Sequence, residues 1–122
     1  MQTYILLTKL GPQASAQFKD RAKSSHDWYT LVKHNCPEVK FLSHFALLGQ
    51  YDFLDIYEAP NEETAAKVSM ISRMNGALNA ESLVAIPHNR FLELSEELSE
   101  QYDSLFKSFM KAKKKTSKKI KK

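Results

Sequence analysis

The chain has 122 residues, 43% of them hydrophobic, which is the size and composition of one ordinary globular domain. Its single cysteine, Cys36, excludes an intramolecular disulfide and favours a reducing compartment. No apolar run has the length of a membrane span, and the first residues lack the segments of a signal peptide. We therefore expect a cytoplasmic protein without membrane association.

The net charge of +4 is unevenly distributed along the chain. Residues 111–122 hold eight of the 18 basic residues and no acidic one, so the rest has ten basic and 14 acidic residues, a net charge of −4. We predict a disordered tail over 111–122, either solvated or in weak contact with nucleic-acid phosphates. Its basic residues are Lys111, Lys113, Lys114, Lys115, Lys118, Lys119, Lys121 and Lys122.

The first elements are a strand and a helix. Residues 3–9 are rich in residues typical of strands, and Gly11-Pro12 ends this run and begins a helical region. Its apolar stripe consists of Phe18, Ala22, Trp28, Tyr29, Leu31 and Val32. Polar residues such as Arg21 lie mostly off the stripe. We expect an interruption near Ser24-Ser25 and an end at Asn35-Cys36-Pro37.

A hairpin over residues 41–57 is the centre of the fold. Two apolar, aromatic-rich runs, 41–48 and 51–57, flank Gly49-Gln50, a pattern typical of a two-residue turn. Gly49 accepts the positive φ of such a turn, or permits close approach of a ligand. Because both runs are nearly continuous in apolar residues, we expect both sheet faces to be covered, one by helices and the other by a second subunit.

A second helix and a fourth strand complete the domain. Asn61 is the expected N-cap, and Ala66, Met70 and Met74, flanked by Val68 and Ile71, are the expected buried side. Asn75-Gly76 ends this helix, and residues 77–86 form the last strand. The order β-α-β-β-α-β predicts an α+β ferredoxin-like plait, a four-stranded antiparallel sheet of order 4-1-3-2 with both helices on one face.

Three segments are therefore expected: a ferredoxin-like domain over 1–90, an amphipathic helix over 91–110 and the tail over 111–122. The helix has one apolar face that must be buried on its own sheet or on a partner. The residues of that face are Phe91, Leu94, Leu98, Tyr102, Leu105, Phe106 and Phe109.

These residues resemble the GYD-domain family, whose signature is a glycine–x–tyrosine–aspartate turn, here Gly49-Gln50-Tyr51-Asp52. The resemblance spans about residues 3–95 and includes Tyr4 to Leu10, Glu58 to Glu63 and Glu81-Ser82-Leu83. It implies a domain of the dimeric α/β-barrel kind, whose copies pair through their open sheet faces, and it implies no established catalytic activity. The long third helix and the lysine tail depart from the usual short form of the family.

Candidate site residues lie in the hairpin. The turn places His44 directly opposite Asp55, as a general acid–base pair or as a structural polar pair in a subunit interface. Tyr51, Phe53 and Tyr57 are expected on the same face as Asp55, where they stack a planar ligand or pack. Asp52 is expected to accept backbone N–H bonds of the turn.

Three functions remain open at this point. The first is an oligomeric domain that binds a small molecule or a partner in the cleft between paired sheets. The second is a small cofactor-free enzyme, of the monooxygenase or isomerase type, with His44 and Asp55 as acid and base. The third is a nucleic-acid-associated protein acting through residues 111–122. No histidine spacing predicts a metal, and no glycine-rich loop predicts a cofactor.

Overall fold

The computed structural model describes the backbone of residues 1–120 and the side chains of residues 1–114. Two compact units are present, Met1–Ala85 and a second unit that begins at Ile86. The elements of the first unit are β1 (Gln2–Leu10), α1 (Pro12–Ala16), the 3-10 helix η1 (Phe18–Asp20), α2 (Arg21–Asn35), β2 (Lys40–Ala46), β3 (Phe53–Ala59), α3 (Glu62–Met74) and β4 (Ala77–Ala85). The second unit contains α4 (His88–Ile120).

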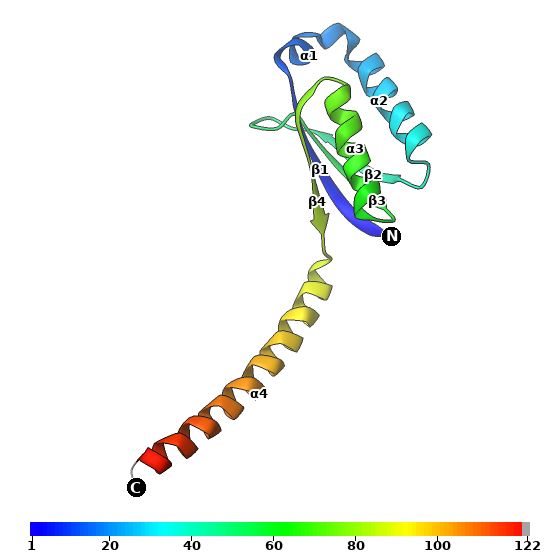
Figure 1. Ribbon diagram of the computed structural model, residues 1–122. Coiled ribbons are helices and arrows are strands. Elements are labelled where there is room, and N and C mark those ends of the chain that lie inside the picture. Colours follow the sequence, from blue (N-terminus) through cyan, green and yellow to red (C-terminus); the bar gives the residue numbers. More distant parts are fainter. Residues whose placement is uncertain (121–122) are drawn as a thin grey trace. The chain divides into compact units, whose positions relative to one another are not determined.

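The first unit is the predicted plait. Its four strands are antiparallel to their neighbours in the order β2-β3-β1-β4, which is the predicted order. Helices α2 and α3 lie on one face of the sheet (Figure 1). The α+β ferredoxin-like fold is therefore confirmed.

The hairpin keeps the predicted register from Ser43 to Ala46, a bulge between Phe41 and Ser43 shifts it by one residue, and the tip is longer than predicted. His44 lies opposite Asp55, and the last bond of the ladder runs from the Leu47 N–H to the Asp52 carbonyl at 2.8 Å. Gly49 has a positive φ of 146°, which favours glycine. Strand β2 ends at Ala46 and β3 begins at Phe53, whereas the prediction placed these ends at 48 and 51. The ladder opens there because the Asp52 N–H donates to the Thr8 carbonyl of β1 and not to the facing strand β2.

The first helical region breaks at a different place from the one expected. The break lies between α1 and α2, at Gln17 and η1, whereas Ser24 and Ser25 lie inside α2. Phe18, expected on the buried stripe, is 82% exposed because it belongs to η1 and not to the helix that packs on the sheet. Val32 is fully buried and Trp28 partly buried, as the stripe predicts, whereas Ala22, Tyr29 and Leu31 are exposed.

Helix α3 buries Val68 and Ile71, as predicted, but exposes the three residues expected at the centre of its buried side. Asn61 is its N-cap, as expected, and accepts the Thr64 N–H at 2.9 Å. The buried side chains are those of Ala65, Val68, Ile71 and Ser72, whereas Ala66, Met70 and Met74 are exposed. Small residues allow a close approach to the neighbouring layer, so the helix turns Ala65 and Ser72 inward and the two methionines outward.

The core lies between the sheet and the two helices. Its largest fully buried side chains are Tyr57, Leu6, Val32, Val39 and Val68. The strand residues that alternate with Leu6 and Tyr57 lie on the opposite face of the sheet, called here the open face. Its apolar members are Ile5, Leu7, Phe45, Leu54, Ile56 and Leu83.

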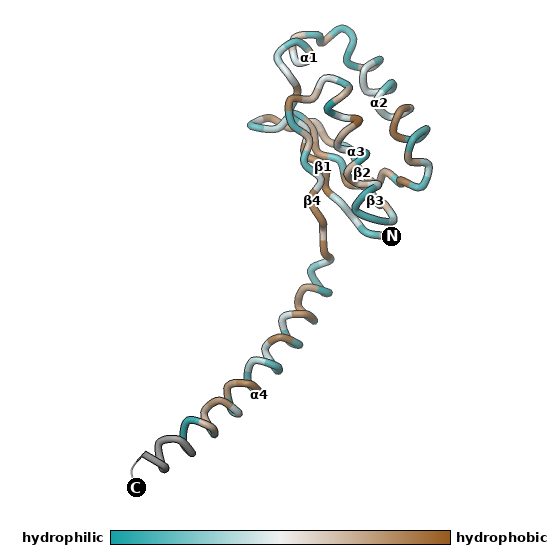
Figure 2. Tube along the Cα trace, viewed as in Figure 1, coloured by the Kyte–Doolittle hydropathy of each residue, from teal (hydrophilic) through white to brown (hydrophobic). Residues whose placement is uncertain are grey.

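Helix α4 extends past Met110, where the expected segments placed the start of the tail. Lysine and alanine are good helix formers, and no glycine or proline interrupts the run, so the helix continues into the lysines. Lys111, Lys113 and Lys114 are exposed, and Lys121 and Lys122 lie outside the described residues. Figure 2 shows apolar and polar residues alternating along α4. Within residues 1–120, none of the helices combines the length and the hydropathy required to span a membrane.

Candidate functional site

The predicted pair of His44 and Asp55 is formed, but on the side of the sheet that the helices cover. Asp55 lies opposite Leu6, and Phe53 lies opposite Thr8, and both Leu6 and Thr8 are buried. The expectation that these residues line a cleft between two sheets is therefore wrong. The alternation of strand side chains places them toward α2 and α3.

The pair combines a buried acid with a half-exposed imidazole. The His44 Nδ1 lies 2.5 Å from the Asp55 Oδ1, and the two side chains are 51% and 4% exposed. Burial raises the pKa of the Asp55 carboxyl above its ordinary value, and the charge and hydrogen bond of His44 oppose that rise. The imidazole also stacks on Phe53, with ring centroids 5.4 Å apart. Since Nδ1 is occupied by Asp55, Nε2 is the nitrogen left to exchange a proton with a ligand.

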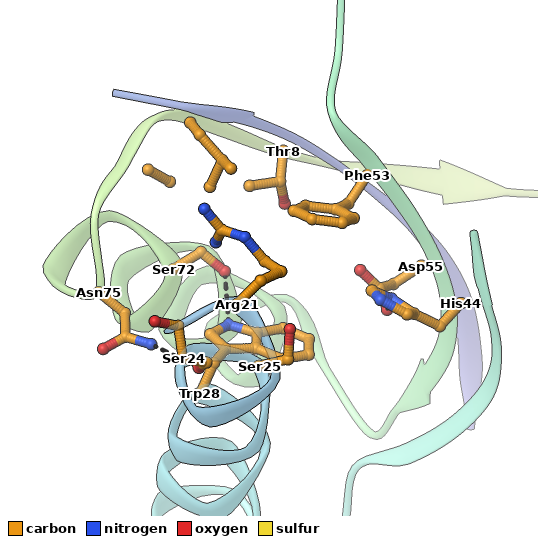
Figure 3. A pocket seen from close by; sticks show the side chains of 12 residues that line it. Thr8, Arg21, Ser24, Ser25, Trp28, His44, Phe53, Asp55, Ser72 and Asn75 are labelled. Carbon is orange, nitrogen blue, oxygen red and sulfur yellow. Dashed lines mark hydrogen bonds and ion pairs between the residues drawn. The ribbon is translucent and has the colours of Figure 1, made fainter. Parts of the chain in front are cut away.

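His44 and Asp55 form one end of a small cleft between the sheet and α2, drawn in Figure 3. Its inner volume is about 50 Å³. The cleft is lined by Thr8, Leu10, Arg21, Ser24, Ser25, Trp28, His44, Phe53, Asp55, Ser72, Asn75 and Ala77. Aromatic rings, hydroxyls and one cation therefore meet in one place, a mixture typical of ligand sites.

Arg21 is the cation of the cleft and was not singled out by the sequence pattern. It is the first residue of α2, and in Figure 3 its side chain lies between Phe53 on the sheet and Trp28 on the helix. Its guanidinium carbon is 5.9 Å from the centroid of the Phe53 ring, and an Nη atom donates to the Ala14 carbonyl. Among the side chains described, no carboxylate forms an ion pair with Arg21.

The floor of the cleft is held by hydrogen bonds between α2 and α3. The Trp28 indole N–H donates to the Ser72 hydroxyl at 2.8 Å, and that hydroxyl donates to the Val68 carbonyl at 3.1 Å. The Asn75 amide donates to the Ser24 carbonyl at 3.3 Å. These bonds hold α2, which carries Trp28 and, two turns earlier, Arg21, against α3.

Tyr57 belongs to the core and does not line the cleft. It is fully buried, stacks on Tyr4 at 5.5 Å, and bonds the Ser82 hydroxyl at 2.7 Å. Burial raises the pKa of its phenol to about 12. Of the three aromatic candidates, only Phe53 is therefore placed to touch a ligand in the cleft.

The glycine–x–tyrosine–aspartate turn ties the hairpin to the other strands. The Asp52 carboxylate accepts the Leu10 N–H at 2.7 Å, so it binds backbone of β1 and not of the turn as expected. The Tyr51 hydroxyl donates to Glu81 at 3.3 Å, on the open face, so Tyr51 does not share the face of Asp55. These contacts give the signature residues a structural role.

The described side chains do not form a metal-binding site. Within the part of the chain whose side chains are described, no group of three or more His, Cys, Asp or Glu residues is placed to hold an ion.

Comparisons with known proteins bear on the family and the fold. The model of the GYD domain matches residues 4–94. No curated protein matches the chain. Among solved structures, FFRP-DM1 is 17% identical with a TM-score of 0.48, and covers 70% of this chain and 100% of its own. The hypothetical protein PHS023 from Pyrococcus horikoshii is 19% identical with a TM-score of 0.43, and covers 71% of this chain and 92% of its own. The family match spans most of the chain, and the protein therefore belongs to the GYD domain family.

Proposed function

We propose that the cleft between the sheet and α2 binds a small carboxylate, with its charged group on Arg21 and its body against Phe53 and Trp28. The single observation that carries this proposal is a guanidinium inside a small cleft without an acidic partner among the described residues. A planar guanidinium has five donors in a geometry that matches a carboxylate, and Arg21 uses one Nη atom on a carbonyl.

The charges of the cleft also favour an anion. Asp55 is the only acid in its lining, and its carboxyl is already engaged by His44. The pair has no net charge when a protonated imidazole faces the carboxylate, or when a neutral imidazole faces the protonated carboxyl. Arg21 then leaves the cleft with a net positive charge, and an entering carboxylate would neutralise it.

A second candidate, a small cofactor-free enzyme, is favoured by the His44–Asp55 geometry. A buried carboxylate on Nδ1 orients the imidazole, while Nε2 stays available as a general base. A molecule retained through purification and identified by native mass spectrometry would supply the substrate. Its conversion should then be lost in His44→Gln, while its binding is retained.

Benzoate is a suitable probe for the binding site, with benzamide as the uncharged molecule of the same shape. We expect Arg21→Gln to weaken benzoate binding at least about tenfold, because a charge-assisted hydrogen bond contributes about 1.5–3 kcal/mol. Arg21→Lys, which keeps the charge and loses the fork, should lie between the two proteins. Isothermal calorimetry measures all three. Equal affinity for benzoate and benzamide in the wild-type protein would contradict the proposal.

We also propose that the open face pairs with a second copy of the chain. Ile5, Leu7, Leu54 and Ile56 occupy the two central strands of that face, and an antiparallel sheet that meets water on one side normally alternates with polar residues there. Phe45, 54% exposed on the edge strand β2, extends the same apolar surface. Pairing through open faces is also what the resemblance to the family implies.

If the open faces of two copies pair, Phe45→Lys should weaken the association of the copies. A charge placed in an apolar contact has to be desolvated, so the association constant from sedimentation equilibrium should fall at least about tenfold. Met70→Lys is the matched control, because Met70 is 60% exposed and lies on α3, away from the open face. The same loss in both variants, or in neither, would argue against the open face as the contact.

A further inference from the structure

Helix α4 carries an apolar stripe that the cleft and the open face do not use. Leu98, Tyr102, Leu105 and Phe109 are between 62% and 71% exposed. They follow one another at spacings of four, three and four residues, and Phe91 precedes Leu98 by seven. This 3.5-residue period keeps one seam of a helix facing a partner helix along its whole length.

The charges of α4 are separated along its axis. All its acidic residues lie between Glu93 and Asp103, Arg90 pairs with Glu93 and Glu97, and its lysines begin at Lys107. In a parallel pair of such helices the acidic halves lie side by side, and so do the basic halves. In an antiparallel pair each acidic half lies beside a basic one, so the charge pattern favours a second copy in the opposite direction.

We propose that α4 pairs antiparallel with α4 of a second copy of this chain. One register satisfies both the stripe and the charges: Leu98 lies opposite Phe109, and Tyr102 lies opposite Leu105. On the outer sides of the pair, acids lie level with lysines of the other copy: Glu93 with Lys114, Glu96 with Lys111, and Glu100 with Lys107. Ser95 and Ala112, two small residues, lie opposite each other in this register.

The charged residues lie off the stripe, so they set direction and register through their field and not through close ion pairs. Such a field decays over about 8 Å at physiological ionic strength and over longer distances at low salt. The preference for the antiparallel direction should therefore be strongest at low ionic strength. A lipid surface is the less favoured occupant, because the acidic half of α4 is repelled by anionic headgroups.

The first test removes the stripe in the full-length chain. Leu98→Gln with Leu105→Gln keeps helix propensity and should lower the association constant at least tenfold in sedimentation equilibrium. Ser104→Gln, on the polar side of the same turns and without any change of charge, is the control and should leave the constant unchanged. Thermal unfolding checks that both variants stay folded. Unchanged association of the stripe variant would overturn the proposal, whatever the fate of the cleft and of the open face.

The second test determines direction by disulfide cross-linking in a Cys36→Ala background. Ser95 and Ala112 are about 25 Å apart along one helix, whereas a disulfide needs Cα atoms about 4.4–6.8 Å apart. Ser95→Cys alone and Ala112→Cys alone should therefore not cross-link, but a mixture of the two chains should. Cross-linking of either chain with itself would show a parallel pair. Binding to phosphatidylserine vesicles without any cross-link would assign α4 to a lipid surface. Either result overturns the proposal.

Discussion

Replacing His44 by alanine is expected to lower the free energy of unfolding by about 3 kcal/mol at pH 8, although the His44 side chain is half exposed. The reason is that Asp55, the hydrogen-bond partner of His44, remains in place. Asp55 is 2% exposed, and without the imidazole its carboxylate is buried with its main hydrogen bond lost. Removing one member of a buried pair is more harmful than removing both, because an unpaired charge is left inside.

The pH dependence of this loss follows from the Asp55 carboxyl. Burial raises its pKa in the folded protein, so its favourable contribution is fully present below the unfolded pKa and is lost as pH rises through the folded value. Without His44 to oppose the rise, the folded pKa moves higher still. The loss in His44→Ala should therefore be large at pH 8 and much smaller at pH 4, where the carboxyl is protonated.

A double variant separates the buried charge from other effects of removing the ring. His44→Ala with Asp55→Asn has no buried acid, so it should recover most of the stability lost at pH 8. Urea unfolding of the wild-type protein and the two variants, at pH 4 and at pH 8, measures the whole cycle. A loss in His44→Ala that is equal at both pH values would show that Asp55 is not the cause.

Tyr57→Ala is expected to destabilise the fold by about 3–5 kcal/mol, the range for truncating a fully buried aromatic residue. Tyr57 is the largest fully buried side chain and touches the rings of Tyr4 and Phe41. Tyr57→Phe keeps the ring and removes only the bond to Ser82, whose hydroxyl still bonds Ser69, so its loss should be about 1 kcal/mol. Urea unfolding measures both.

Phe53→Ala provides the contrast that distinguishes core from cleft. Phe53 lies four residues from Tyr57 on the same strand face, but it lines the cleft and is only partly buried. It should lose less stability than Tyr57→Ala and more affinity for benzoate. If Tyr57→Phe weakened benzoate binding as strongly as Phe53→Ala, the placement of Tyr57 outside the site would be wrong.

The hairpin register could be predicted because local chemistry determines it. The turn at Gly49 sets which residues oppose each other, and the pairing of His44 with Asp55 follows from that turn alone. Which face of the hairpin the helices cover does not follow from the turn. Both faces of the hairpin are apolar in sequence, and only the pairing of β3 with β1 shows that Asp55 lies beside buried Leu6.

The buried side of α3 and the role of Arg21 depend on contacts between distant segments. Met70 and Met74 are more apolar than Ala65 and Ser72, but close packing of helices on a sheet favours the smaller residues. Ser72 is inside because it bonds Trp28, 44 residues away in sequence. Arg21 resembles any polar residue on the exposed side of a helix until α2 is placed over Phe53.

The most direct test of the cleft is an NMR titration of ¹⁵N-labelled protein with benzoate, following the side-chain nitrogens of Arg21 and His44. Both signals are expected to shift and to saturate at a common benzoate concentration, whereas benzamide should leave Arg21 unchanged. If these two signals stay fixed while resonances elsewhere on the protein move, the cleft is not where small carboxylates bind.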